Sequence, residues 1–195
     1  MTHRVLLPAT LVVLAILIGC GGVTLNQPLP SRHSAELLQA LEGYWHATDG
    51  VFEIRFSDSG KGRLGALEWD EDHFGLIEWE IVATASGDGG FVSMRTQDEA
   101  ELSTNDPGDP ESYVFARFTL TPLGDLVLWA PDPTAFATAV DDGLLMGSVT
   151  DDREDPWVEI ESPPDSVLAF LEDPANDDLF ILESPLVLKR LPTLP

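Results

Sequence analysis

The chain has 195 residues, of which 34 are aspartate or glutamate and only 10 are lysine or arginine, so its formal net charge is −24. A surface this acidic repels nucleic acid and anionic lipid headgroups, which argues against a nucleic-acid-binding function. The single cysteine permits no intramolecular disulfide and no cysteine metal cluster. Few lysines and many aspartates are typical of proteins from saline habitats, and solubility in salt explains the charge better than a dedicated acidic binding surface.

The first feature along the chain is a short basic start followed by an apolar run from Val5 to Ile18. A membrane-spanning helix needs about 20 residues, so this shorter run fits a signal peptide instead. It ends in Leu17-Ile18-Gly19-Cys20, which resembles the lipobox of bacterial lipoproteins. The resemblance implies that residues 1–19 are removed as a signal peptide and that Cys20 is the site of lipid attachment.

The same resemblance implies a location. Gly21 follows the lipidated cysteine, in place of the aspartate associated with retention at the inner membrane. We therefore expect a protein of the cell envelope, on the periplasmic face of the outer membrane if the source is Gram-negative, with the membrane as its partner through the N-terminal lipid. The alternatives are an uncleaved short anchor and, for Cys20, a lone reactive thiol.

After the lipobox, residues 20–33 contain glycines and prolines and no periodic apolar face, which predicts a lipidated tether. The remaining residues, 34–195, are expected to form a single domain. This domain begins with a short helix at Ala35–Glu42, which Ser34 caps and Gly43 ends.

From residue 51 onward, apolar and polar residues alternate with the period of half-buried antiparallel strands. The clearest case is Ile77, Trp79 and Ile81, which alternate with glutamates. The longest predicted loop, Gln97 to Ser112, is polar and acidic. Strands are predicted at 51–56, around Leu67 and Trp69, and at 77–81, 91–96, 113–120, 126–130, 144–149, 157–160, 179–182 and 186–191, and helices at 134–140 and after Ser162-Pro163.

These segments amount to about eight to ten short strands with two or three short helices and no βαβ alternation, which predicts an antiparallel barrel or sandwich. Gly43-Tyr44-Trp45, after a short helix, resembles the Gly-x-Trp entry of lipocalin-like barrels. The run of hairpins and the C-terminal helix are similar as well, and the resemblance implies a closed barrel. The chain departs from the lipocalin pattern because it lacks a disulfide and places about two strands, rather than one, after that helix.

No motif in the chain predicts catalysis. It has no Gly-x-Ser-x-Gly elbow, no glycine-rich phosphate loop and, once Cys20 is lipidated, no free thiol. Asp70, Asp72 and Gly75 match the start of a calcium-binding EF-hand loop, but Ile81 stands where the bidentate glutamate should be. The histidines are too far apart in sequence to predict a zinc site. We therefore expect no enzymatic activity, no metal and no cofactor.

The best candidate for a ligand site lies in the predicted strand at 113–120. Tyr113, Phe115 and Arg117 share one face of it, and the other face is apolar too, as expected where a strand lines a cavity on one side and packs on the other. If Arg117 faces inward, it can pair with the carboxylate of an amphiphile. The surplus of carboxylates favours the other orientation, in which Arg117 pairs outward with one of the many surface acids.

Trp69 and Trp79 are further candidates to line such a site, because neighbouring strands can bring them together, although core packing is the default role of a tryptophan. The leading hypothesis is non-catalytic binding of a small apolar or amphiphilic molecule. The alternative is a cell-envelope interaction or assembly module with a packed barrel and no ligand, whose partner is an envelope protein. An enclosed cavity favours the first hypothesis, and a filled barrel with an exposed apolar patch favours the second.

Overall fold

The computed structural model describes residues 22–47, 50–57, 59–70, 73–95, 112–150 and 156–192, with only the backbone described between 67 and 77. The predicted signal peptide at 1–19, the lipid attachment site Cys20 and most of the predicted acidic loop lie outside these residues. Among the described residues, no helix is long and apolar enough to cross a lipid bilayer.

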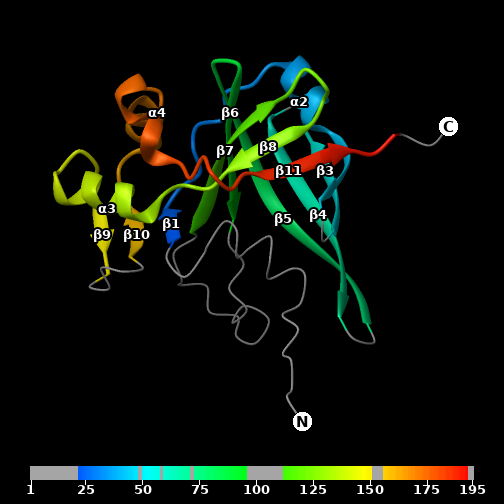
Figure 1. Ribbon diagram of the computed structural model, residues 1–195, viewed down its shortest axis with the longest axis horizontal. Coiled ribbons are helices and arrows are strands. Elements are labelled where there is room, and N and C mark those ends of the chain that lie inside the picture. The colour runs from blue at the N-terminus through cyan, green and yellow to red at the C-terminus, as the bar shows by residue number, and fades with distance from the viewer. Residues whose placement is uncertain are drawn as a thin grey trace, which may run out of the picture.

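Eight antiparallel strands close into a barrel, as Figure 1 shows. The barrel strands are β2 (Gly43–Ala47), β3 (Gly50–Phe56), β4 (Lys61–Asp70), β5 (His73–Ser86), β6 (Gly89–Arg95), β7 (Tyr113–Leu120), β8 (Leu126–Trp129) and β11 (Leu186–Arg190). Each pairs with the next in this order, and β11 pairs back onto β2. The predicted mainly β fold with a closed antiparallel barrel and a few short helices is therefore confirmed.

A core of apolar side chains fills the inside of the barrel, because every second residue of its strands is apolar and faces inward. The helix α2 (Ala35–Leu41) covers one end of this core with Leu38 and Leu41. Its N-terminus is capped as predicted, since Oγ of Ser34 accepts a hydrogen bond from the backbone N–H of Leu37 at 3.1 Å. The buried members of this core are Leu38, Leu41, Trp45, Ala47, Phe52, Ile54, Ala66, Trp79, Ile81, Ala83, Met94, Val114, Phe118, Leu126 and Leu188.

A second group of elements packs against the outside of the barrel, and we call it the side module (Figure 1). It consists of β1 (Gly22–Leu25), α3 (Pro133–Asp141), β9 (Gly147–Val149), β10 (Trp157–Ile160), α4 (Pro164–Leu171) and the 3-10 helix η2 (Pro174–Leu179). Strand β1 joins it to the barrel, because β1 pairs in parallel with β10 and in antiparallel with the first residues of β7. The side module has an apolar core of its own, which includes Phe136 and Leu168.

Strand β7 is the wall that the two cores share. Val114 and Phe118 belong to the barrel core, whereas Tyr113 and Phe115 belong to the core of the side module. This arrangement explains why both faces of the predicted strand at 113–120 are apolar. The face that carries Tyr113, Phe115 and Arg117 is the outer one.

The predicted tether at 20–33 needs correction, because the residues from Gly22 onward are part of the fold. All four residues of β1 are buried, and Oγ1 of Thr24 donates a hydrogen bond to the carbonyl oxygen of Val158, 134 residues away. The backbone N–H of Leu29 donates to Oγ of Ser93 at 3.1 Å, which holds the following segment against the outside of the barrel. A four-residue strand whose main partner is so distant leaves no local periodicity, so the sequence pattern missed it.

The C-terminal part of the chain needs a smaller correction. The predicted strand at 179–182 is the end of η2 followed by an isolated bridge between Pro131 and Phe180. Its apolar residues were correctly taken as buried, since Leu179 and Phe180 lie in the core of the side module, but burial there does not require a strand. Within the described residues, β11 is therefore the only strand that follows α4. The predicted strand at 144–149 shortens to β9.

The hairpin of β4 and β5 extends beyond the barrel as a two-stranded ribbon (Figure 1). The pairing of β3 with β4 ends at Ala66, and the pairing of β5 with β6 begins only at Ile81. Consequently, residues 67–70 of β4 pair with residues 73–76 of β5, and no third strand among the described ones pairs with either segment.

Candidate functional site

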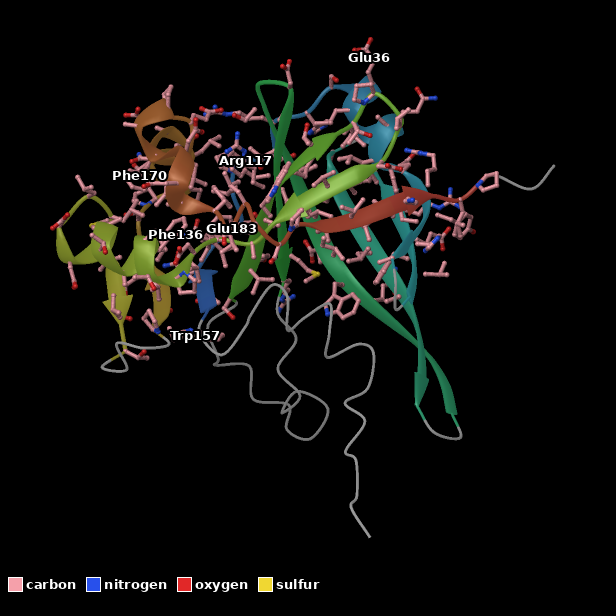
Figure 2. The ribbon with its side chains drawn as sticks, in the orientation of Figure 1. Glu36, Arg117, Phe136, Trp157, Phe170 and Glu183 are labelled. Atoms are coloured by element: carbon pink, nitrogen blue, oxygen red, sulfur yellow. The ribbon has the colours of Figure 1, made fainter. Side chains whose placement is uncertain are left out.

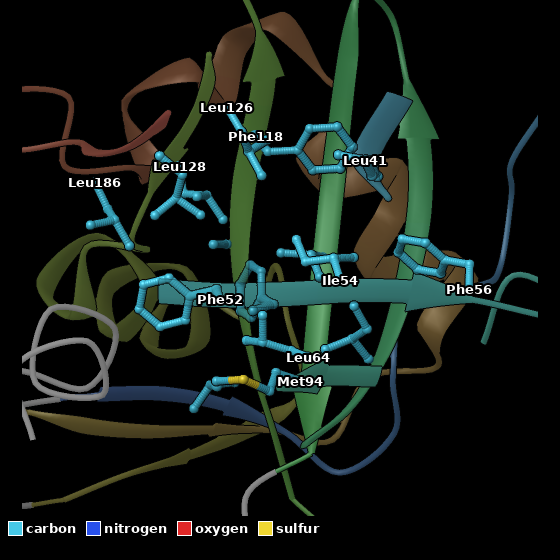
Figure 3. Close-up of a pocket in the computed structure, with 16 residues that line it drawn as sticks. Leu41, Phe52, Ile54, Phe56, Leu64, Met94, Phe118, Leu126, Leu128 and Leu186 are labelled. Carbon is cyan, nitrogen blue, oxygen red and sulfur yellow. The ribbon is translucent and has the colours of Figure 1, made fainter. Parts of the chain in front are cut away.

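The barrel encloses a small cavity of about 70 Å³, shown in Figure 3. Its lining is apolar throughout and comprises Leu41, Phe52, Ile54, Phe56, Leu64, Ile81, Val92, Met94, Val114, Phe115, Ala116, Phe118, Leu126, Leu128, Leu186 and Leu188. Its volume is that of only about two water molecules in the liquid, whereas pockets for drug-sized ligands hold roughly 300–1,000 Å³. A long-chain amphiphile does not fit in this cavity without a large displacement of the core.

The end of the barrel near α2 is closed by a large side chain. Trp45, the tryptophan of the Gly-x-Trp motif, is completely buried, and its Nε1 donates a hydrogen bond to the carbonyl oxygen of Leu41 at 2.9 Å. The guanidinium of Arg190 lies 4.5 Å from the centre of the Trp45 ring and donates to the carbonyl oxygens of Ala40 and Glu42. Because these contacts join α2, β2 and β11, they oppose the entry of a ligand at this end.

A larger hollow lies outside the barrel, between the outer face of β6–β8 and the side module. Its volume is about 570 Å³, within the range of small-ligand pockets. One wall is the turn between β5 and β6, and the other is formed by the end of α4 and the start of η2. We call it the outer cleft; it is lined by Ser86, Gly87, Asp88, Gly89, Gly90, Phe91, Arg117, Phe118, Thr119, Trp129, Leu171, Glu172, Pro174, Asp177 and Leu182.

Three strands place a cation between two aromatic residues in this cleft. In the sheet register, Phe91 of β6 lies opposite Arg117 of β7, which in turn lies opposite Trp129 of β8. Figure 2 shows Arg117 between the barrel and α4. The Arg117 side chain is 40 % exposed, so it is available to a ligand that enters the cleft. Phe91 is buried in the core of the side module, so the accessible apolar surface beside this donor, which suits carboxylates, is that of the half-buried Trp129.

The charges around Arg117 are mostly negative. Its Nη1 lies 3.4 Å from Oδ1 of Asp177, a carboxylate that is 73 % exposed. Glu172, which also lines the cleft, pairs with Nη1 of Arg32 at 3.7 Å. Ion pairs this exposed contribute little stability, because water screens them and ordering the side chains costs entropy. A ligand carboxylate that displaces Asp177 from Arg117 therefore costs little free energy of interaction.

A separate ion pair lies on the outer face of β3 and β2. Nε of Arg55 donates to Oε1 of Glu53 at 2.8 Å, and the guanidinium lies 5.8 Å from the centre of the Tyr44 ring. The hydrogen bond from Arg55, followed by one from Tyr44, lowers the pKa of the Glu53 carboxyl. A carboxylate held in its charged form on an open face is a poor general acid, so this cluster offers no acid–base site.

The structure disperses the five residues that the sequence suggested as ligand contacts. Trp79 is 8 % exposed and belongs to the barrel core, whereas Tyr113 and Phe115 pack inside the side module. The ring of Phe115 meets that of Phe136 edge to face at a centroid distance of 5.6 Å, so it is a packing residue. Arg117 lines the outer cleft, and it has the outward orientation, paired with a surface acid, that the surplus of carboxylates favoured.

The register also separates the two tryptophans that were expected to stack. Trp69 lies opposite Phe74 in the ribbon, five rows along the β4–β5 ladder from the row that joins Leu64 and Trp79. The side chain of Trp69 lies outside the described part of the chain, so its expected stacking on Trp79 stays a prediction.

Sequence reasoning missed Phe91 and Trp129 as neighbours of Arg117. Each falls in a predicted strand, but the pairing of β6, β7 and β8 was not available from the alternation alone. The Gly87–Gly90 turn beside them was predicted only as a turn, although it also forms a wall of the cleft.

In the part of the chain that the structure describes, no three His, Cys, Asp or Glu side chains gather closely enough to hold a metal ion. No family model, no curated protein and no solved structure matches this chain. The site must therefore be interpreted from its own chemistry.

Proposed function

We propose that the protein is a lipid-anchored, non-catalytic binding protein of the cell envelope, in which the outer cleft takes a small amphiphile with a carboxylate headgroup. The anchor is supported by the lipobox resemblance at Leu17–Cys20. The single observation that carries the binding proposal is the row of Phe91, Arg117 and Trp129 in a cleft of about 570 Å³.

The cleft is a better site than the barrel cavity for two reasons. Its volume is about 570 Å³, compared with about 70 Å³ in the barrel. It also combines apolar side chains with polar ones, whereas the lining of the barrel cavity offers no group to orient a headgroup. In this proposal the barrel is a packed scaffold that holds the three strands of the site in register.

The ligand class follows from the groups in the cleft. Arg117 donates paired N–H groups that match a carboxylate, and Asp177 already occupies the position that such a carboxylate would take. The half-buried Trp129 and the exposed Leu182 provide apolar surface for the rest of the molecule, and the buried Phe91 and Leu171 lie behind it in the core of the side module. Because the protein carries a formal net charge of −24, long-range repulsion opposes an anionic ligand, and added salt should therefore strengthen binding.

The proposal can be tested by titrating the Cys20→Ser protein, which carries no lipid, with a long-chain fatty acid. Trp129 lies in the cleft, so its fluorescence should report binding. Arg117→Gln should weaken binding by about 1.5–3 kcal/mol, roughly 10-fold to 150-fold, which is the range for a hydrogen bond to a charged group. Asp177→Asn should strengthen binding, because it removes a competing carboxylate.

A matched control is Arg63→Gln, which removes a different exposed arginine, one that pairs with Glu78 on the outer face of β4. This variant should bind as the parent does. Saturable binding that Arg117→Gln leaves unchanged would place the ligand outside the outer cleft and overturn this assignment of the site. No saturable binding at all would defeat the amphiphile proposal.

The second candidate function is an interaction or assembly module, and the projecting β4–β5 ribbon favours it. A two-stranded hairpin is marginally stable by itself in water, and a protein partner is one way to stabilise it. Leu67 is paired with Leu76 and Trp69 with Phe74, so two pairs of apolar residue types lie two rows apart in the ladder. A chain that binds no fatty acid in the titration would make this module the better proposal.

A further inference from the structure

The surface beside the start of β1 has an exposed indole. Gly22 and Trp157 are register partners in the parallel pair of β1 and β10. A methyl group added at Gly22 would lie 2.7 Å from Cζ3 of Trp157, so the ring lies directly over this glycine. Trp157 is nevertheless 39 % exposed, and Figure 2 shows it at the end of β10 beside β1.

This indole is also close to the proposed lipid attachment site in the chain. Cys20 precedes Gly22 by two residues, and two residues span at most about 7 Å even when fully extended. β1 is buried and paired from Gly22 onward, so in sequence only Gly21 separates Cys20 from the described fold. A lipid on Cys20 therefore brings Trp157 to the membrane surface.

We infer that Trp157 inserts into the headgroup region of the bilayer that holds the acyl chains of Cys20, and so fixes the orientation of the anchored protein. The inference rests on the proposed anchoring through Cys20. The interfacial layer on each side of a bilayer is roughly 5–8 Å thick, which is comparable to the reach from Cys20 to Gly22. Tryptophan is enriched in this layer, because its ring is apolar and its N–H still finds a hydrogen-bond partner there.

The charge of the protein indicates which bilayer suits this contact. With a formal net charge of −24, the protein is repelled by anionic headgroups, so the indole and the acyl chains must provide the attraction. A bilayer of zwitterionic phosphatidylcholine should therefore allow the contact. In this orientation β1 and β10 lie at the membrane, and the β4–β5 ribbon extends toward the same side of the molecule as the start of β1 (Figure 1).

Quenching by brominated lipid tests the inference in the full-length, lipidated protein. The protein is reconstituted into vesicles of phosphatidylcholine, with or without bromine on acyl carbons close to the glycerol, and tryptophan emission is compared between the two. We expect the brominated lipid to quench part of the emission in the parent and much less of it in Trp157→Phe. Trp79→Phe is the matched control, since it removes a tryptophan from the barrel core, and it should leave the quenched emission unchanged.

Vesicle flotation and the mass of the acylated N-terminal peptide separate the two ways of failing. A protein that carries no acyl group and does not float overturns the anchoring and this contact with it. A protein that floats but shows equal quenching in the parent and in Trp157→Phe overturns the contact alone. If Trp157 is covered by a second copy of the chain instead, quenching by lipid is absent and its emission depends on the protein-to-lipid ratio, which also overturns the inference.

Discussion

Leu126→Ala tests whether the barrel interior is packed. Leu126 is 2 % exposed, lies on β8 and lines the barrel cavity. In the register it faces Leu120 on one neighbouring strand and Leu188 on the other. The truncation therefore removes three carbon atoms from the middle of the barrel core, at a place where the surrounding strands are closed into a barrel and cannot easily collapse.

The expected loss has two parts. Transfer of the three lost groups accounts for about 2.4 kcal/mol at ~0.8 kcal/mol each. The cavity grows from about 70 Å³ to roughly 150 Å³, and the added void costs about 2 kcal/mol at ~24 cal/mol per Å³. Leu126→Ala should thus lower the free energy of unfolding by about 4 kcal/mol, within the usual range for buried leucines.

Urea denaturation followed by tryptophan fluorescence measures this loss. A dry apolar cavity of about 150 Å³ is large enough to bind benzene, so benzene should stabilise the variant but not the parent. Val187→Ala is the control, because Val187 is exposed on the neighbouring strand, and its effect should stay within about 0.5 kcal/mol. A loss below about 1 kcal/mol in Leu126→Ala, or stabilisation of the parent by benzene, would refute the packed barrel.

Burial of Trp79, the anchor at Cys20 and the acidic charge can each be tested separately. Trp79→Ala should destabilise the protein by about 3–5 kcal/mol, because Trp79 is buried in the barrel core, and a loss below about 1 kcal/mol in urea denaturation would mean that its burial is wrongly assigned. Cys20→Ser should move the protein from the membrane to the soluble fraction, since the lipid is its proposed anchor, and unchanged partitioning would contradict the lipoprotein proposal. The melting temperature should rise between low and high concentrations of sodium chloride, because salt screens repulsion at a formal net charge of −24, and a flat or falling response in calorimetry would remove the saline-habitat interpretation.

The residues of the outer cleft could be predicted from the sequence only in part. Alternation within the strand at 113–120 correctly put Tyr113, Phe115 and Arg117 on one face, but it could not say which face points into the barrel. That choice depends on what covers each face, and here the side module covers the outer one. Phe91 and Trp129 become neighbours of Arg117 only through the pairing of β6, β7 and β8, which no single strand encodes.

The sequence by itself determined the local features: the alternating strands, the turns, the Ser34 cap of α2 and the prediction of an antiparallel barrel. These depend on neighbours within a few residues, and their periodicity can be recognised without knowledge of the fold. Only the tertiary structure decided that β1 belongs to the fold, that the barrel is nearly filled and that Trp157 lies over Gly22. Each of these depends on contacts between segments far apart in the chain, because burial and register are properties of the packed whole.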